Sequence, residues 1–286
     1  MNPAVVASPP AARLPDNEIF PDADFRHRLR LARAEPAAFF GSWSCGPGLL
    51  AERAHWLRAT PGRCLLSVPA AAPLIEETAC LLNAWRITVP TGGDPTDLWM
   101  RIAASIEPDL VLLQPGPLGA NMVAAAVCFP SSWAPEDKLG HTLDEIHGVV
   151  PGLNQALGPA IRSFLDRLPP AVASLRANWG LSASPELNQH PARGLPRLGL
   201  PLDPAAVWLR IEHQALVRLP QTGGVLFGIR IDARPLLGFV ANPEPARALA
   251  RALRSMPESM SRYKGLACVS SPLAEWIESA VPETAA

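Results

Sequence analysis

Charged and polar side chains recur along one stretch of the sequence in a pattern that could build a binding site. Within residues 208–219, even-numbered positions carry Arg210, Glu212, Gln214 and Arg218. Side chains two residues apart on a β-strand share one face. A carboxylate among guanidinium groups can bind an ionic ligand through charge-assisted hydrogen bonds. Alternating charge is equally typical of a face that is solvated or covered by a partner, so both interpretations stay open.

Common motifs and targeting signals are absent from the sequence. It contains no phosphate-binding loop, dinucleotide fingerprint, H-E-x-x-H or G-x-S-x-G. Its five cysteines are odd in number and form no C-x-x-C pair, which disfavours a disulfide framework or a cysteine-built metal site. Residues 1–15 lack the features of a secretory signal. We therefore expect a cytoplasmic protein.

Composition narrows the class of protein further. The chain has 286 residues, of which 48% are apolar and 18% charged, so it can bury a sizeable core. The formal net charge of -1, without a long basic run, argues against nucleic-acid partners and against a polybasic membrane anchor. The apolar runs are too short to cross a bilayer, which predicts no membrane partner.

The elements that would position the polar face follow from hydrophobic periodicity. Residues 28–87 are mainly helical in pattern, whereas 109–114 with 122–129, and 208–219 with 225–233, indicate two β-hairpins. Further helices are expected at 153–168, 245–255 and 272–280. Without β-α-β alternation, this order predicts an α+β fold with an antiparallel sheet. Residues 1–20, rich in Pro and Ala, are expected to form a flexible arm.

Four blocks of the sequence resemble the haem-binding alpha subunit of the haem-dependent oxidative N-demethylase family, and they occur in the order expected for that family. The longest are residues 127–152, VCFPSSWAPEDKLGHTLDEIHGVVPG, and 209–230, LRIEHQALVRLPQTGGVLFGIR. Two short matches, RANW at 176–179 and YKG at 263–265, complete the set. The resemblance runs from about Leu29 to Trp276.

The resemblance implies a fold and an activity. It implies a PAS-like haem-binding domain over 107–286, with its antiparallel sheet and C-terminal helices, preceded by a helical extension over 21–106. The implied enzyme is a monooxygenase-type oxidoreductase with haem b, which uses O2 to demethylate a small secondary amine such as dimethylamine. Electrons are expected from NADPH through partner subunits that carry FMN and a 2Fe–2S cluster. A further partner would hold tetrahydrofolate and capture the formaldehyde.

Within the resemblance, His147 is the expected axial ligand of the iron. A neutral imidazole is a common haem ligand, and its second nitrogen is usually held by an acceptor. His141, six residues earlier, is the nearest competitor, and His213 is the next. His213 falls on the apolar face of segment 208–219 and reaches the pocket only if that face is the inner one.

The remaining expected site residues come mainly from the functional interpretation of the polar face within residues 208–219. Glu212, Arg210 and Arg218 are expected to be catalytic, with Glu212 near the substrate ammonium. Arg210, Arg218 and Lys138 are expected to bind the cofactor together with His147. Strand alternation predicts that Arg210, Glu212 and Arg218 face the pocket together or not at all.

Some positions depart from the expected pattern or have two interpretations. His213 and Ala215 stand where the family pattern leads us to expect Arg and Thr, so a different amine is an open alternative. Asn178-Trp179 is expected to pack at the edge of the sheet, and Tyr263-Lys264 before a glycine to end a helix. Two rival functions remain: a non-catalytic haem- or gas-sensing PAS-like binding protein, and a haem-free structural partner.

Overall fold

The computed structural model describes residues 12–43, 47–89 and 94–282. Seven strands form one antiparallel sheet in the order β1-β5-β6-β7-β3-β4-β2. The strands are β1 Ala32–Ala34, β2 Leu65–Ser67, β3 Asp109–Gln114, β4 Asn121–Ala126, β5 Ala173–Ser182, β6 Trp208–Arg218 and β7 Val225–Pro235. The sheet and its flanking helices confirm the predicted α+β class.

Helices and short 3-10 turns surround this sheet. The helices are α1 Asp16–Ile19, α2 Pro36–Phe40, α3 Pro47–Ala59, α4 Pro61–Cys64, α5 Ala72–Ala84, α6 Pro95–Ser105, α7 Leu143–Gly148, α8 Leu153–Asp166, α9 Leu236–Phe239, α10 Pro243–Ser255, α11 Glu258–Tyr263 and α12 Ser270–Ala280. The 3-10 turns are η1 Pro69–Ala71, η2 Pro135–Asp137, η3 Pro191–Arg193 and η4 Pro204–Ala206. None of the helices in the described ranges is long and apolar enough to cross a membrane.

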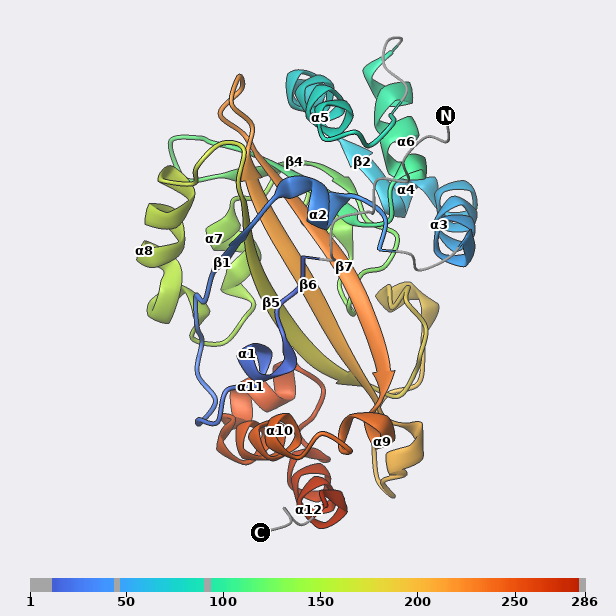
Figure 1. Cartoon of the computed structure of the whole chain (residues 1–286), viewed down its shortest axis with the longest axis vertical. Helices are drawn as coiled ribbons and strands as arrows, with labels where there is room; N and C mark the ends of the chain where they lie inside the picture. Colours follow the sequence, from blue (N-terminus) through green and yellow to red (C-terminus); the bar gives the residue numbers. More distant parts are fainter. Residues whose placement is uncertain (1–11, 44–46, 90–93, 283–286) are drawn as a thin grey trace, which may run out of the picture.

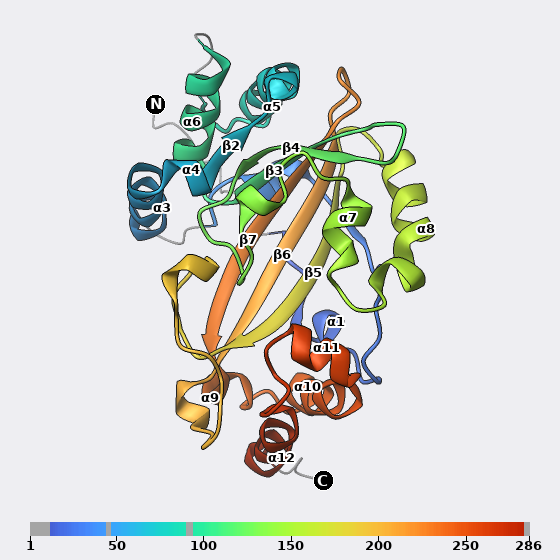
Figure 2. The same cartoon turned by 180° about the vertical axis from the view of Figure 1, so that it is seen from behind.

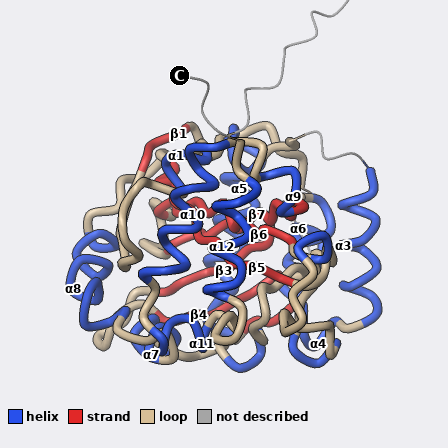
Figure 3. The backbone as a smooth tube through the Cα atoms, turned by 90° about the horizontal axis from the view of Figure 1, so that it is seen from below, coloured by secondary structure: helices blue, strands red, loops and turns tan. Residues whose placement is uncertain are grey.

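The helices divide between the two faces and the two ends of the sheet. Helix α2 lies in front of the sheet in Figure 1, whereas α7 lies in front of it in the reverse view of Figure 2, with α8 at the side of the sheet. Helices α3 to α6 gather at the end near β2, and α10 to α12 at the opposite end. The view from below in Figure 3 shows the strands enclosed between these layers.

The two predicted hairpins are present and carry most of the sheet. β3 pairs with β4, with a register shift between Leu112 and Leu113, and β6 pairs with β7 over their whole lengths. β3 also pairs with β7, which joins the two hairpins into one surface. The hairpins therefore provide the rigid centre on which a site can be built.

The sequence did not reveal the strands outside these hairpins. β5 lies beside β6, and Asn178-Trp179, expected to pack at the edge of the sheet, lies within this ten-residue strand. β1 and β2, three residues each, come from the segment expected to be a helical extension and form the two outer strands. Residues 1–11 of the expected arm lie outside the described residues, whereas Leu14 and Phe20 are buried.

The odd-numbered side chains of β6 face the main core. Leu209, Ile211 and Val217 are fully buried there. Gly228 on β7 lets α2 approach this face closely, because a Cβ at that position would lie 2.5 Å from the ring of Phe40. The even-numbered side chains consequently face the other way, toward α7.

Candidate active site

A hollow on the α7 side of the sheet has two compartments. The larger compartment, about 520 Å³, lies over β6 and β7 and beneath α7. The smaller compartment, about 320 Å³, lies beside β5 and the segment 19–29. Both volumes fall in the range of small-molecule sites, roughly 300–1,000 Å³. The compartments share the lining residues His147, Val150, Asn178, Trp179, Gln214, Phe227, Tyr263 and Lys264.

The polar face of β6 forms part of the wall of the larger compartment. Arg210, Glu212 and Gln214 all line it, and each is buried. Arg218 has the same orientation but lies beyond the end of the hollow, where Leu216 packs in a small apolar cluster. The prediction that all the charged residues face the pocket together was therefore wrong for Arg218, because the strand is longer than the cavity.

Glu212 and Gln214 present two hydrogen-bond acceptors. Gln214 Nε2 donates to Glu212 Oε2 at 2.8 Å. A carboxylate only accepts hydrogen bonds, so the amide must turn its nitrogen toward Glu212 and its oxygen away. Gln214 Oε1 is buried without a hydrogen-bond partner among the described residues. An unpaired buried acceptor is costly, so it favours a ligand that donates hydrogen bonds.

Arg210 is held rigidly by its neighbours. Its guanidinium donates to Ser131 Oγ at 2.8 Å and to the carbonyls of Phe129, Glu186 and Leu187. Burial lowers the pKa of Arg210 to about 10, although Glu212 and Asp109 oppose this shift. Arg210 therefore contributes a fixed positive charge to the wall. It also links the loop at Phe129 and Ser131 to the loop at Glu186 and Leu187.

Arg218 stabilises the end of helix α8. Its guanidinium donates to the carbonyls of Leu165, Asp166 and Leu168, and to that of Gly223 in the β6–β7 turn. The last carbonyls of a helix lack intrahelical partners and carry partial negative charge, so an arginine is favourable there. The N–H groups of Arg218 are therefore used in hydrogen bonds to these four carbonyls.

His147 reaches both compartments from α7. Thr142 and Glu145 form a capping box that fixes the start of this helix, and His147 follows in its last turn. Burial lowers the pKa of His147, and the nearby charge of Arg176 lowers it further. The imidazole is thus favoured in the neutral form that a metal ion binds. Its ring nitrogens form no hydrogen bond within the described ranges of the chain.

The competing histidines lie elsewhere. His141 is exposed, and its Nδ1 is 3.6 Å from Glu145 Oε2. His213 lies on the opposite face of the sheet, with its ring centroid 5.7 Å from that of Trp43 and its Nε2 3.9 Å from Asp232 Oδ2. Neither residue lines the hollow, because His141 is on the surface and His213 has the wrong strand parity.

Three residues near the ends of the hollow add polar groups. Lys138 is half-buried and lines the larger compartment. Tyr263 and Lys264 line both compartments, and Gly265, with φ of +69°, ends α11 as predicted. Lys264 Nζ donates to the carbonyl oxygen of Trp179 at 2.6 Å, and burial lowers the pKa of Lys264 to about 8.

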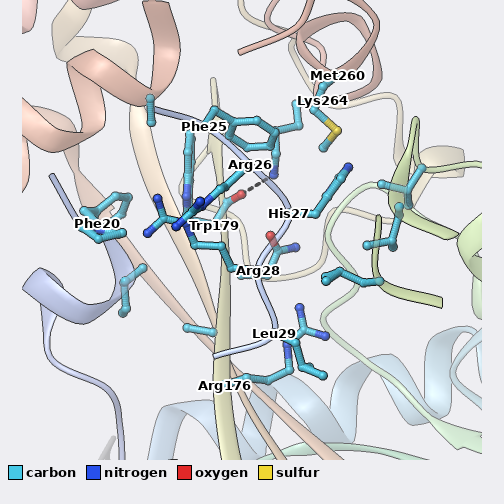
Figure 4. Close-up of a pocket in the computed structure, with 18 of the residues that line it drawn as sticks. Phe20, Phe25, Arg26, His27, Arg28, Leu29, Arg176, Trp179, Met260 and Lys264 are labelled. Carbon is cyan, nitrogen blue, oxygen red and sulfur yellow. Dashed lines mark hydrogen bonds between the residues drawn. The ribbon is translucent and has the colours of Figure 1, made fainter. Parts of the chain in front are cut away.

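The sequence did not single out the β5 side of the hollow. Arg176 lies directly opposite Gln214, and Asn178 opposite Glu212. β1 pairs only with residues 173–175 of β5, so the rest of that strand has an open edge beside the smaller compartment. Figure 4 shows Phe25 to Leu29 running past this edge, with Arg176 and Trp179 beside them. The alternation of side chains within RANW could have indicated a strand, but Ala and Asn have low strand propensity.

The depressed pKa of Lys264 makes a testable difference to stability. Its folded-state pKa of about 8 lies below the ordinary value of 10.5, so the penalty for holding it charged is full below pH 8 and disappears as pH rises to 10.5. The free energies of unfolding of wild type and of Lys264→Met are measured by urea denaturation at pH 7 and at pH 10.5. From pH 7 to pH 10.5, we expect the value for wild type to rise by about 1–2 kcal/mol relative to that for the variant, after a discount for partial solvent access. A difference that does not change with pH would contradict this.

Comparison with known families identifies the family of the chain. A family model described as haem-dependent oxidative N-demethylase, alpha subunit-like, matches residues 75–274. The chain belongs to this family. The family description of this N-demethylase-like chain indicates an oxidoreductase that depends on haem, and its designation as an alpha subunit implies further subunits.

The larger compartment of the N-demethylase-like chain suits a haem. Its apolar wall can take a flat macrocycle, and His147 offers a neutral imidazole without a described partner. Lys138 is half-buried at the wall, where an ammonium can pair with a carboxylate. The apolar part of the wall consists of Val111, Leu113, Met122, Leu143, Ile146, Phe227 and Ile229.

Proposed function

We propose that the chain is the haem b-binding subunit of an enzyme that oxidatively demethylates a secondary amine. The observation that carries this proposal is the pair of acceptors on β6. Glu212 Oε1 accepts no hydrogen bond within the described chain, and Gln214 Oε1 is buried without a partner. A secondary ammonium has two N–H donors, one for each oxygen. The pair therefore matches the charge and the donor count of such a substrate.

The proposed reaction consumes one O2 and two electrons. An N-methyl amine, R–NH–CH3, reacts with O2, two electrons and two protons to give R–NH2, formaldehyde and water. When bound, the haem supplies the redox-active iron for this oxidation. The electrons come from NADPH through partner subunits with FMN and a 2Fe–2S cluster, and a tetrahydrofolate-binding partner takes up the formaldehyde.

The described residues have distinct proposed roles. His147 would bind the haem iron and Lys138 would pair with a haem propionate. Glu212 binds the substrate ammonium and accepts its proton at Oε1, while Arg210 adds a fixed positive charge to the wall. Arg218 is left out of the proposed site, because its guanidinium is occupied at the end of α8.

Haem loading and product analysis test the proposal. The purified chain, loaded with haem, should show a Soret band that responds to added secondary amine, and it should release formaldehyde with amine, O2 and a chemical reductant. NADPH alone should support no useful turnover until the redox partners are added. A Soret band without formaldehyde would favour the gas-sensing alternative, and failure to bind haem would favour the structural one.

Glu212→Gln tests the ammonium site directly. The substitution keeps the shape of the side chain but removes its charge. Loss of one charge-assisted hydrogen bond, roughly 1.5–3 kcal/mol, should weaken amine binding about tenfold or more without reducing haem content. Spectral titration of the haem-loaded protein measures both quantities. Glu275→Gln, on the exposed surface of α12, is the matched control. An unchanged dissociation constant in Glu212→Gln would refute the role of this carboxylate.

A further inference from the structure

Arg176 is a cation without an assigned counter-ion. It is half-buried, lines the smaller compartment, and forms no hydrogen bond or ion pair within the described segments. Its guanidinium is close enough to Glu212 and His147 for their charges to interact, yet no N···O contact within 4 Å joins Arg176 to Glu212. A guanidinium stays charged in a protein and binds carboxylates through paired hydrogen bonds. This side chain is therefore prepared for an anionic ligand.

The position of Arg176 relates this anion site to the ammonium site. Arg176 lies opposite Gln214 on the neighbouring strand, and Glu212 is two residues further along β6 on the same face. Gln214 lines both compartments, whereas Glu212 lines only the larger and Arg176 only the smaller. One small molecule at the junction can therefore meet all three side chains.

The charges nearby also disfavour a simple dialkylamine. A dialkylammonium at Gln214 would lie beside Arg176, and Lys264 lines the same junction. Like charges in a partly desolvated cavity repel each other. A substrate with its own carboxylate would pair with Arg176 and remove this repulsion.

We propose that the substrate is an N-methylated amino acid, bound as a zwitterion. Its secondary ammonium donates to Glu212 and Gln214, and its carboxylate accepts from Arg176. This rests on the proposed function and specifies its substrate class. The reaction removes the N-methyl group as formaldehyde and leaves the primary amino acid, with the same balance of O2, electrons and protons as above.

Three ligands test this inference on the haem-loaded wild-type protein. They are N-methylglycine, its carboxamide N-methylglycinamide, and dimethylamine, each titrated by calorimetry and by the Soret spectrum. The extra charged hydrogen bonds should make N-methylglycine bind roughly tenfold to a hundredfold more tightly than the other two. Equal or tighter binding of the carboxamide or of dimethylamine would overturn the inference. If none of the three binds, the proposed function itself fails.

The variant Arg176→Gln locates the carboxylate. It should remove the preference for N-methylglycine and leave haem content unchanged, while dimethylamine should bind more tightly because the repulsion by Arg176 is gone. Arg197→Gln, on an exposed loop, is the matched control and should behave as wild type. Loss of haem in Arg176→Gln, with Arg197→Gln intact, would show that Arg176 holds a haem carboxylate and would overturn the inference. Should Arg176→Gln not fold, the ligand comparison on wild type still decides.

Discussion

Replacement of His147 by alanine is expected to lower haem affinity at least about a hundredfold and to abolish stoichiometric loading. Among the histidines that the structure describes, His147 alone lines both compartments, and its lowered pKa favours the neutral imidazole. Changes to groups that merely orient a metal ligand cost about 10–100-fold, so loss of the ligand itself should cost more. Haem titration followed at the Soret band measures the affinity.

A second variant separates loss of the ligand from misfolding. His147→Gly leaves space for free imidazole, which should restore haem binding and a spectrum close to that of wild type. His141→Ala is the matched control, because His141 is exposed and lies outside the hollow. An unchanged haem spectrum in His147→Ala would refute the assignment of this ligand.

The largest loss of stability is expected from Arg53→Leu. Arg53 Nη1 lies 2.5 Å from Asp109 Oδ1, and both side chains are buried, with 0% and 1% exposed. Arg53 also donates to the carbonyls of Ala103 and Ala126, and Asp109 accepts from the backbone amides of Cys128 and Phe129. Removing one member leaves a buried charge unpaired, which costs about 3–5 kcal/mol. Urea denaturation measures this loss.

Two comparisons identify the cause of that loss. The double variant Arg53→Leu/Asp109→Leu removes both charges and should recover part of the stability. Arg162→Leu breaks the ion pair of Arg162 with Asp144, in which the two side chains are 49% and 43% exposed. This variant should lose at most about 1 kcal/mol of unfolding free energy. Equal losses in Arg53→Leu and Arg162→Leu would show that burial of the pair does not determine its contribution.

The sequence predicted the parts of the site that follow local rules. The alternation in β6 correctly placed Glu212 and Gln214 on one face, because the side-chain period of a strand is fixed. Which face lines the cavity depends on how the helices pack, and the strand pattern alone does not contain that information. The position of Arg218 beyond the cavity likewise follows from the length of the hollow.

Other elements depend on tertiary contacts that a local pattern does not show. β5 contains Ala, Asn and Gly, which have low strand propensity, and it is held by pairing with β6 along its whole length. β1 has three residues, too few for any periodicity. Arg176 became a candidate only through its register opposite Gln214, which the fold sets.

The open edge of β5 has a consequence for the behaviour of the protein in solution. An uncovered strand edge offers free amides and carbonyls to another chain and so promotes self-association. Here the segment around Phe25–Leu29 passes alongside that edge. The rings of Phe20 and Trp179 pack together with their centroids 5.7 Å apart. Lys264 occupies one edge carbonyl with a charged group, and charged lysines discourage strand pairing. The wall of the smaller compartment thus also protects the sheet from intermolecular β-pairing.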